Sequence, residues 1–342
     1  MRFPYPRRDY GPAAGSGGET AIPVMSRILL IKTSSLGDIV HNLPVVTDIA
    51  TAMPDATIDW VVEEDFAAIP RLHPGVSRVL PVAVRRWRRG LWRPAVWGEL
   101  RGFLRTLRAQ DYDAVIDTQG LLKSAWITRA ARGPRYGLDR ASSREPLGLF
   151  YDRTYSVPWG QHAVERNRSL AAQALGMPVQ GPARYGIGAA AQSFDGPDTD
   201  GPYAVLLHAT SAAPKLWPEE RWLALGRVFA ARGLSSVLPW GTPAERERSL
   251  RLAGQIPHSV VPERLELAAL AGLLARARVV VGTDTGLTHL AGALGTPTVG
   301  LYCATDPAAT GLHGCPRGVN LGGVDLLPAV AQVVAALDGW LQ

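Results

Sequence analysis

Short apolar runs alternate with amphipathic segments along most of the chain, and this alternation constrains the fold more than any other feature. The runs RILLIK (27–32), TIDWVVE (57–63) and YDAVIDT (112–118) have the length of strands and are separated by segments with helical periodicity. Strands that run parallel need a long crossover, usually a helix, between them. The sequence therefore predicts a doubly wound parallel sheet, which places the protein in the α/β class.

The same alternation starts again near residue 203, which predicts a second α/β domain. The segment before the restart, SFDGPDTDGP (193–202), consists largely of Gly, Asp and Pro, which is typical of a linker. We expect an N-terminal domain at 25–190, a linker at 191–202 and a C-terminal domain at 203–342. Open α/β sheets bind ligands at the carboxyl ends of their strands, so two such domains would enclose a cleft for two substrates.

The overall composition indicates a globular protein with acidic partners. Of the 342 residues, 46% are hydrophobic and 19% are charged, and the formal net charge is +6. A basic balance favours nucleic acid, an anionic membrane surface or phosphorylated substrates. Residues 1–24 are rich in Pro, Gly and Arg and lack the apolar region of a signal peptide, so we expect a disordered extension there. No apolar run approaches the roughly 20 residues that a membrane-spanning helix needs.

The segment KTSSLGDIVH places Asp38 near the start of a predicted helix, after a strand that ends at Lys32. The helix dipole favours an acidic residue in the first turn, and this is the simplest role for Asp38. A carboxylate at the mouth of a cleft could instead be a general base that accepts a hydroxyl proton. The segment has no GxGxxG pattern and so does not predict a dinucleotide site.

A second candidate site follows the strand expected at 203–209, in the segment HATSAAPKLWP. Thr210 and Ser211 are small hydrogen-bond donors, and Lys215 adds a cation close by. Donors and a cation at the end of a strand suit a pyrophosphate group. A polar loop with a solvated lysine would have the same composition, so both interpretations stay open here.

A third candidate site lies in VVVGTDTGLTH (279–289). Thr285 and Gly286 stand where free backbone N–H groups point out of a helix, and His289 shares a helical face with Thr285. Asp284 would be a good N-cap, but its carboxylate would repel a phosphate bound at the same place. Both features fit if Asp284 accepts hydrogen bonds from sugar hydroxyls and the amides hold a phosphate. We therefore favour a nucleotide-sugar site.

The segment RRWRRGLWR (85–93) concentrates arginines around Trp87 and Trp92 and contains no acidic residue. Arginines beside aromatic residues suit single-stranded nucleic acid. They also suit an anionic lipid head group, and a solvated loop has the same pattern. The segment by itself does not distinguish these three interpretations.

Together, these segments resemble glycosyltransferase family 9, and within it the lipopolysaccharide heptosyltransferases that add the first heptose. The resemblance runs from about Met25 to the C-terminus. It rests on LIKTSSLGDIVHNLP, DWVVEEDFAAIP, PVAVRRWRR, YDAVIDTQGLLKSA, REPL, QHAVERNR, LHATSAAPKLWPEERW, LPWGTPAERER and VGTDTGLTHLAGALGTPTVGLY. The motif DTGLTHL alone indicates only the broad family, whereas KTSSLGD, RRWRR and HATSAAPKLWP point to enzymes that add the first heptose.

The resemblance implies the GT-B fold, in which two Rossmann-like domains face each other across a cleft. It implies an inverting enzyme that moves L-glycero-D-manno-heptose from ADP-heptose to the first Kdo of Kdo2-lipid A, at the cytoplasmic face of the inner membrane. The N-terminal domain would bind the acceptor and the C-terminal domain the donor. The resemblance leaves open that the last helix packs back on the N-terminal domain.

The resemblance also implies roles for individual residues. Asp38 would deprotonate the acceptor hydroxyl, and Lys215 would offset charge on the leaving group. Glu245 would hold the donor's ribose, and Leu265 would pack on its adenine. The complete donor set would be Thr210, Ser211, Lys215, Glu245, Leu265, Asp284, Thr285, Gly286 and His289. The acceptor set would be Arg85, Arg86, Arg88, Arg89 and Arg144.

The expected partners are ADP-heptose, Kdo2-lipid A and the inner membrane surface, without nucleic acid, because the arginines would meet the acidic Kdo and the lipid phosphates. No cofactor or metal is expected, since the sequence shows no metal-ligand cluster and Lys215 with helix amides could neutralise a pyrophosphate. The chain departs from the family pattern at Ser211, where Thr is usual, at Leu265, where Met is usual, and at CATDP (303–307), where GPTDP is usual.

Three alternatives stay open from the sequence. A near alternative is another family 9 transferase, such as the one that adds the second heptose. A sugar-nucleotide epimerase on the same fold would need no acceptor, so the arginine segment would have no acceptor to bind. A basic module that only binds nucleic acid or another anion would not need Asp38 beside the cleft.

Overall fold

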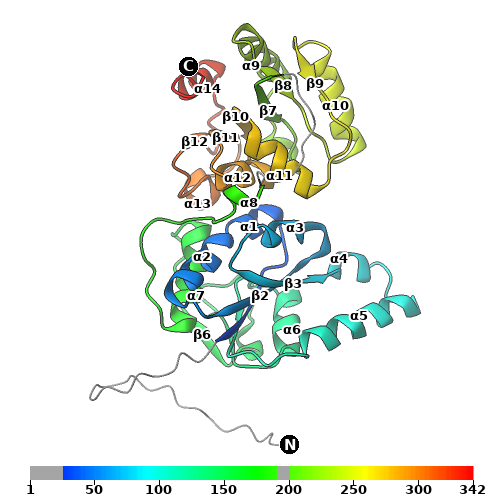
Figure 1. Ribbon diagram of the computed structural model, residues 1–342, viewed down its shortest axis with the longest axis vertical. Helices are drawn as coiled ribbons and strands as arrows, with labels where there is room; N and C mark the ends of the chain where they lie inside the picture. Colours follow the sequence, from blue (N-terminus) through cyan, green and yellow to red (C-terminus); the bar gives the residue numbers. More distant parts are fainter. Residues whose placement is uncertain (1–25, 192–200, 342) are drawn as a thin grey trace, which may run out of the picture.

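The computed structural model describes residues 26–191 and 201–341, which form two parallel sheets of six strands each (Figure 1). The predicted α/β class, with two facing Rossmann-like sheets, is confirmed. The extension expected at 1–24 and most of the linker expected at 191–202 lie outside the described residues. Within the described ranges, no helix combines the length and the apolar character needed to cross a membrane.

Both sheets have the same strand order. The first is ordered β3-β2-β1-β4-β5-β6 and the second β12-β11-β10-β7-β8-β9, so each half follows the pattern 3-2-1-4-5-6 when its own strands are counted. The first sheet comprises β1 (Arg27–Ile31), β2 (Thr57–Glu63), β3 (Val76–Val82), β4 (Ala114–Asp117), β5 (Arg135–Leu138) and β6 (Arg153–Tyr155). The second comprises β7 (Tyr203–Leu207), β8 (Ser235–Val237), β9 (Ser259–Val260), β10 (Val279–Thr283), β11 (Thr298–Tyr302) and β12 (Gly318–Gly322).

The strand order locates the places where ligands bind. In this type of sheet the crossovers change direction beside the first strand, and the crevice at that point holds the ligand. Here the change falls between β1 and β4 in the first sheet and between β7 and β10 in the second. The three segments singled out around Asp38, Lys215 and Asp284 follow β1, β7 and β10, so all of them begin at such a crevice.

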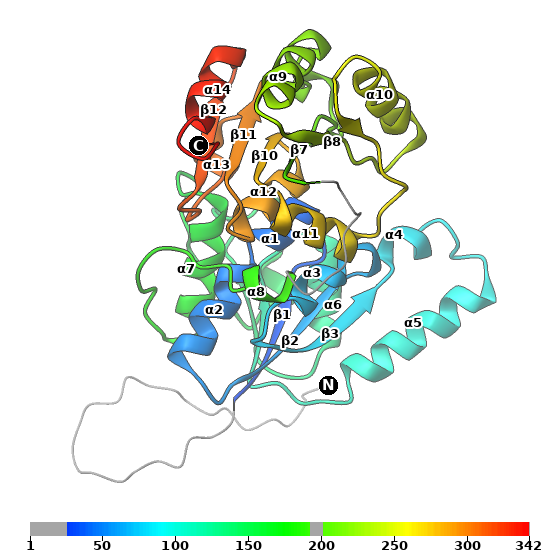
Figure 2. The same ribbon diagram turned by 45° about the horizontal axis from the view of Figure 1, so that its top comes forward.

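Helices cover both faces of each sheet (Figure 2). The first half contains α1 (Leu36–Val40), α2 (Leu43–Ala52), α3 (Ala68–Arg71), α4 (Val84–Trp87), α5 (Pro94–Leu107), α6 (Leu122–Ala130), α7 (Ala163–Leu175) and α8 (Gly188–Ala191). The second contains α9 (Glu219–Ala231), α10 (Pro243–Ala253), α11 (Leu267–Arg276), α12 (Gly286–Ala293), α13 (Pro307–Thr310) and α14 (Val330–Leu337). Strand β1 shows why its sequence is apolar throughout: Ile28 and Leu30 lie in one core cluster, and Leu29 and Ile31 lie in another.

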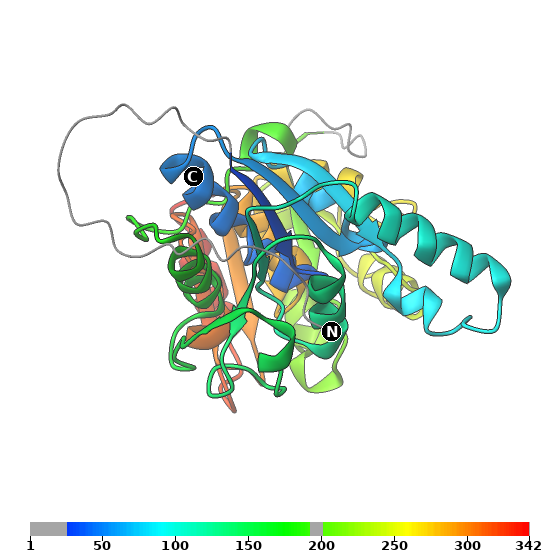
Figure 3. The ribbon, with the colours of Figure 1, turned by 90° about the horizontal axis from the view of Figure 1, so that it is seen from below.

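Helices α4 and α5 and the last helix, α14, pack in different ways. Helices α4 and α5 project from one side of the first sheet, as Figure 3 shows from below. Helix α14 packs against α9 and against strands β11 and β12. Its buried residues Val333 and Leu337 belong to the same core cluster as Phe229 and Leu301 of the second half. The option that the last helix packs back on the N-terminal half is therefore wrong, because its apolar face is already buried against the C-terminal sheet.

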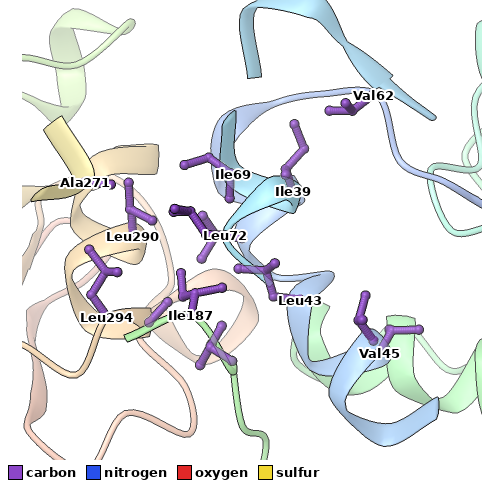
Figure 4. Close-up of a cluster of buried hydrophobic side chains, with 14 of the residues drawn as sticks. Ile39, Leu43, Val45, Val62, Ile69, Leu72, Ile187, Ala271, Leu290 and Leu294 are labelled. Atoms are coloured by element: carbon purple, nitrogen blue, oxygen red, sulfur yellow. The ribbon is translucent and has the colours of Figure 1, made fainter. Parts of the chain in front are cut away.

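One apolar cluster joins the two halves. Leu72 and Ile69 from the region of α3 point toward Ala271 of α11 and Leu290 of α12, with Ile187 beside them (Figure 4). Helices α1 and α12 are also in direct contact. A Cβ atom at Gly286 would lie 2.7 Å from the Cβ of Leu36 and 2.9 Å from the backbone nitrogen of Gly37, so the absence of a side chain there lets the two helices meet.

This close approach predicts that Gly286→Ala destabilises the protein by about 1–3 kcal/mol, because the methyl group overpacks a contact that involves backbone atoms. Urea denaturation would measure the free energy of unfolding. The matched control is Gly102→Ala on α5, where a Cβ would meet no heavy atom within 4 Å. Alanine is a better helix former than glycine by about 1 kcal/mol, so the control should be neutral or stabilising. Equal effects at both positions would contradict the prediction.

Candidate active site

The structure brings the crevices of the two sheets together. Helix α1 begins after β1, helix α12 begins after β10, and the two helices contact each other near their first turns. Asp38 lies on α1, whereas Gly286 and His289 lie on α12. The predicted acceptor and donor segments, which contain Asp38 and Asp284 and are far apart in the sequence, therefore meet at one boundary between the halves.

Asp38 is the third residue of α1 and closes a capping box. Its Oδ2 accepts hydrogen bonds from the backbone N–H of Ser35 (2.8 Å) and from the Ser35 hydroxyl (2.9 Å). The simple role predicted for Asp38, an acid in the first helical turn, is thus present. The side chain is also partly exposed and lines a cavity of about 350 Å³. Its position is compatible with both a capping and a chemical role.

The cavity beside Asp38 is basic. Arg144, which the resemblance implies for the acceptor, lines it together with Lys32 and Arg166. Lys123 stands close by and donates a hydrogen bond to the Ser34 hydroxyl. The cavity is completed mainly by residues of the first half, with Ala309 and Thr310 from the second half. The sequence analysis missed Lys32, Lys123 and Arg166 as site residues, although all three stand in the segments that carry the family resemblance.

Lys32 is an unusual cation because it is almost fully buried, with 6% of its surface exposed. Its Nζ donates to the carbonyl oxygen of Thr118 (2.7 Å) and to Oδ1 of Asn167 (3.4 Å). Burial lowers the pKa of Lys32, and the carboxylates of Asp38 and Asp117 oppose that shift. An anionic group in the cavity would stabilise the charged lysine in the same way.

On the C-terminal side, Asp284 is the centre of a polar cluster. Its Oδ2 accepts hydrogen bonds from Nζ of Lys215 (2.7 Å) and from the Thr305 hydroxyl (2.8 Å), and its Oδ1 lies 3.4 Å from Nε2 of His289. Burial would raise the pKa of Asp284, but the hydrogen bonds from His289, Lys215 and Thr305 outweigh burial and hold the pKa well below its usual range. The ion pair with Lys215 offsets the repulsion that a phosphate would otherwise meet.

Of the other predicted donor residues, Thr210 and Thr285 lie next to Asp284, whereas Glu245 and Leu265 make contacts elsewhere. Thr210 donates its hydroxyl hydrogen to the backbone carbonyl of Asp284 (3.1 Å), and Thr285 is the N-cap of α12 without a side-chain cap. Ser211 is exposed. Glu245 instead caps α10, where its Oε2 accepts from the backbone N–H of Gly241 (2.7 Å) and Thr242 (3.1 Å). Leu265 is partly buried and packs against the cluster that joins the halves.

The arginines near Trp87 have different surroundings. Arg86 forms ion pairs with Glu64 (2.9 Å) and Glu99 (2.8 Å), which come from neighbouring elements although the segment itself contains no acid. The Arg85 guanidinium lies 5.2 Å from the centre of the Phe66 ring. Among the described residues, Arg88 and Arg89 take part in no ion pair, and both are exposed. These two arginines are thus the most available to an acidic ligand.

Comparison with known proteins places the chain in a family. A model described as glycosyltransferase family 9 (heptosyltransferase) matches residues 100–326. Lipopolysaccharide heptosyltransferase 1 of Pseudomonas aeruginosa is 52% identical over 299 residues, which cover 86% of this chain and 83% of that protein. The protein of the same name from Escherichia coli K12 is 46% identical over 292 residues, covering 84% of this chain and 91% of the relative.

Solved structures agree with the sequence comparison. The structure of E. coli heptosyltransferase WaaC with ADP has a TM-score of 0.86 and 41% identity to this chain, and covers 92% of this chain and 99% of its own. The E. coli ADP-heptose lps heptosyltransferase II has a TM-score of 0.73 but 19% identity, which shows the shared fold alone. The GT-B fold implied by the sequence is confirmed. The chain belongs to glycosyltransferase family 9, the heptosyltransferases, and is a glycosyltransferase.

Proposed function

We propose that this enzyme transfers L-glycero-D-manno-heptose from ADP-heptose to the first Kdo of Kdo2-lipid A, with inversion of the anomeric carbon. One observation carries the proposal: α1, which presents Asp38 to a basic cavity, is in contact with α12, which begins beside Lys215 and Asp284. Relatives named lipopolysaccharide heptosyltransferase 1 support it, as do structures of WaaC with ADP and with ADP-2-deoxy-2-fluoro heptose. Heptosyltransferase II and an epimerase are not favoured.

In the proposed reaction, Asp38 accepts the proton of the Kdo hydroxyl. The hydroxyl oxygen then attacks the anomeric carbon of heptose from the side opposite the diphosphate, and the bond from that carbon to the phosphate oxygen breaks. The cavity suits an acidic sugar because Lys32, Arg144 and Arg166 line it. A Kdo carboxylate placed among these cations would hold the hydroxyl near Asp38.

The departing ADP gains negative charge as the bond breaks. Lys215 and the backbone N–H groups at the start of α12, which no side chain caps, would stabilise that charge. In the structure Lys215 is held by Asp284, so the lysine is oriented before the donor arrives. Heptose hydroxyls would then share Asp284 with Lys215, Thr305 and His289.

The acceptor is a lipid, and the projecting α4–α5 region is our candidate for the contact with the cytoplasmic face of the inner membrane. Leu91 and Trp92 are 50% and 75% exposed. Arg88 and Arg89 lie next to them. Exposed apolar side chains beside arginines suit an anionic lipid surface, where the rings enter the interface and the charges meet head groups.

The transfer assay with Asp38 variants tests the proposed function. Asp38→Asn should lower the rate of heptose transfer by about 10²- to 10⁴-fold, because an amide cannot accept the hydroxyl proton. The amide oxygen can still accept hydrogen bonds from Ser35, so the cap of α1 is kept. Calorimetry should show unchanged affinity for ADP-heptose. If Asp38→Asn transfers heptose at a near-normal rate while Asp38→Ala transfers it much more slowly, Asp38 only caps the helix.

Lys215→Met should weaken ADP-heptose binding and also slow a single turnover. Hydrogen bonds to charged groups correspond to about ten- to hundredfold in affinity. The loss should be larger in the transition state because the diphosphate carries more charge there. Lys123→Met removes a cation from the N-terminal half and is the control, which should leave donor affinity unchanged. Normal binding and normal single-turnover rates in Lys215→Met would contradict the assigned role.

Neutralising the arginines beside Trp87 should raise the KM for Kdo2-lipid A and leave the KM for ADP-heptose unchanged. Exposed charge pairs are worth roughly 1 kcal/mol or less each, so the combined Arg85, Arg86, Arg88 and Arg89 to alanine variant should show more than any single change. Higher salt should reproduce part of the effect by screening. The control for net charge changes four exposed arginines elsewhere to alanine, namely Arg129, Arg132, Arg153 and Arg227. A normal KM for acceptor, or a raised KM for donor, would contradict the assignment.

A further inference from the structure

Four histidine rings form a row through the boundary between the halves. The ring centres are 4.6 Å apart for His289 and His41, 5.4 Å for His41 and His162, and 4.3 Å for His162 and His313. The outer two, His289 and His313, come from the C-terminal half, and the inner two come from the N-terminal half. The rings pack by edge and face, and no group of His, Cys, Asp or Glu in the described ranges is arranged to hold a metal ion.

The two ends of the row differ from its middle. At one end Nε2 of His289 lies 3.4 Å from Asp284, and at the other Nε2 of His313 lies 2.9 Å from Glu165. In the described part of the chain, no hydrogen bond or ion pair joins a carboxylate to His41 or His162. His162 accepts a hydrogen bond from the Val164 N–H at Nδ1 (3.1 Å) and lies 3.1 Å from the Gly311 carbonyl oxygen at Nε2. These two bonds fit the neutral ring with its hydrogen on Nε2.

His41 is a buried ring with an unsatisfied nitrogen. It is 4% exposed, and among the described residues its Nε2 has no hydrogen-bond partner, which is also true of Nδ1 of His289. Burial lowers the pKa of His41, and the nearby His289, His162 and Lys32 lower it further, whereas Asp284 opposes the shift. Burial also lowers the pKa of His162 to about 4, with His313 and His289 adding to the shift and Gly311 and Glu165 opposing it. Burial of both inner rings therefore favours their neutral form while the halves are in contact.

His41 also lies where the two substrate sites are joined. It is the C-cap of α1, the helix that carries Asp38, and its ring packs edge-on against His289 of α12. On the same side, a Cβ at Gly37 would lie 3.3 Å from Cδ2 of His289. Residues of α1 thus enclose the His289 imidazole from the N-terminal half, while Asp284 contacts it from the C-terminal half.

We propose that His41 is a positioning residue of the donor site, whose ring holds the His289 imidazole against Asp284 across the boundary between the halves. The inference rests on the proposed function, because it takes His289 to contact ADP-heptose. The donor site would then be complete only when the N-terminal half is in place. A proton on His41 would bury a positive charge beside Lys32 and His289, and the cost of burying that charge, which Asp284 opposes, would favour separation of the halves.

The sign of the pH effect follows from the lowered pKa. Separated halves would bind a proton at His41 near pH 6.5, whereas the halves in contact exclude it. Each pH unit below 6.5 would favour separation by up to about tenfold for that ring. The kcat/KM for ADP-heptose should therefore fall between pH 6.5 and pH 5 in the unmodified enzyme.

Two variants of His41 separate the packing of the ring from its proton. His41→Ala removes the ring and should raise the KM for ADP-heptose and the Kd for ADP by about two- to tenfold, the range that corresponds to an aromatic pair. The KM for acceptor should change less. His41→Phe keeps a ring but cannot be protonated, so it should bind the donor nearly normally and lose less kcat/KM at pH 5 than the unmodified enzyme.

The control is His73→Phe, which removes another buried imidazole of the N-terminal half, one that is bonded to Thr47 and Gly75. It should change neither the KM for ADP-heptose nor the fall in kcat/KM between pH 6.5 and pH 5, which is the acid limb of the pH profile. An unchanged Kd for ADP in a folded His41→Ala would overturn the inference. A rise in the Kd for ADP in His73→Phe as large as that in His41→Ala would also overturn it. If His41→Ala does not fold, an acid limb in His41→Phe identical to that of the unmodified enzyme would overturn it. ADP calorimetry decides the inference even if heptose transfer to Kdo2-lipid A is absent, which would defeat only the proposed function.

Discussion

The contact between α1 and α12 is the constraint on which the rest of the structure depends. Gly286 has no side chain, so its backbone lies against Leu36 and Gly37 of the other half. The contact places Asp38 and the start of α12 at one boundary, although each half has its own sheet and its own crevice. A wider separation would leave the cavity beside Asp38 and the polar cluster around Asp284 as independent sites. Transfer between two substrates needs both crevices at the same place.

Electrostatics then divides the boundary into two regions. The N-terminal region presents buried and exposed cations around one cavity, which suits an acidic acceptor. The C-terminal region holds Asp284 between Lys215 and His289, so that its negative charge is balanced before any phosphate arrives. In the proposed reaction, the same carboxylate would orient Lys215 for the leaving group and remain next to the sugar. This role would explain why a turn that needs only a cap and a glycine contains Asp284, Thr285, Gly286 and His289 together.

Much of this architecture could be predicted from the sequence because it depends on local patterns. Alternating apolar runs gave the sheet class, and strand ends located the segments at Asp38, Lys215 and Asp284. What could not be predicted depends on contacts between distant segments. Nothing near Arg86 in sequence indicates Glu99, nothing near Lys215 indicates its pairing with Asp284, and the row of histidines joins four separate elements. Packing of α14 was open for the same reason, since an amphipathic helix does not specify which half it covers.

The central claim is that the two crevices act as one transfer site. Its most direct test follows ADP release by the unmodified enzyme from ADP-heptose, with and without Kdo2-lipid A, and determines the anomeric configuration of the product by NMR. The account predicts that ADP appears at a substantial rate only with the acceptor and that the new glycosidic bond has the inverted configuration. Equal consumption of ADP-heptose without acceptor, or a product that retains the donor's configuration, would contradict it.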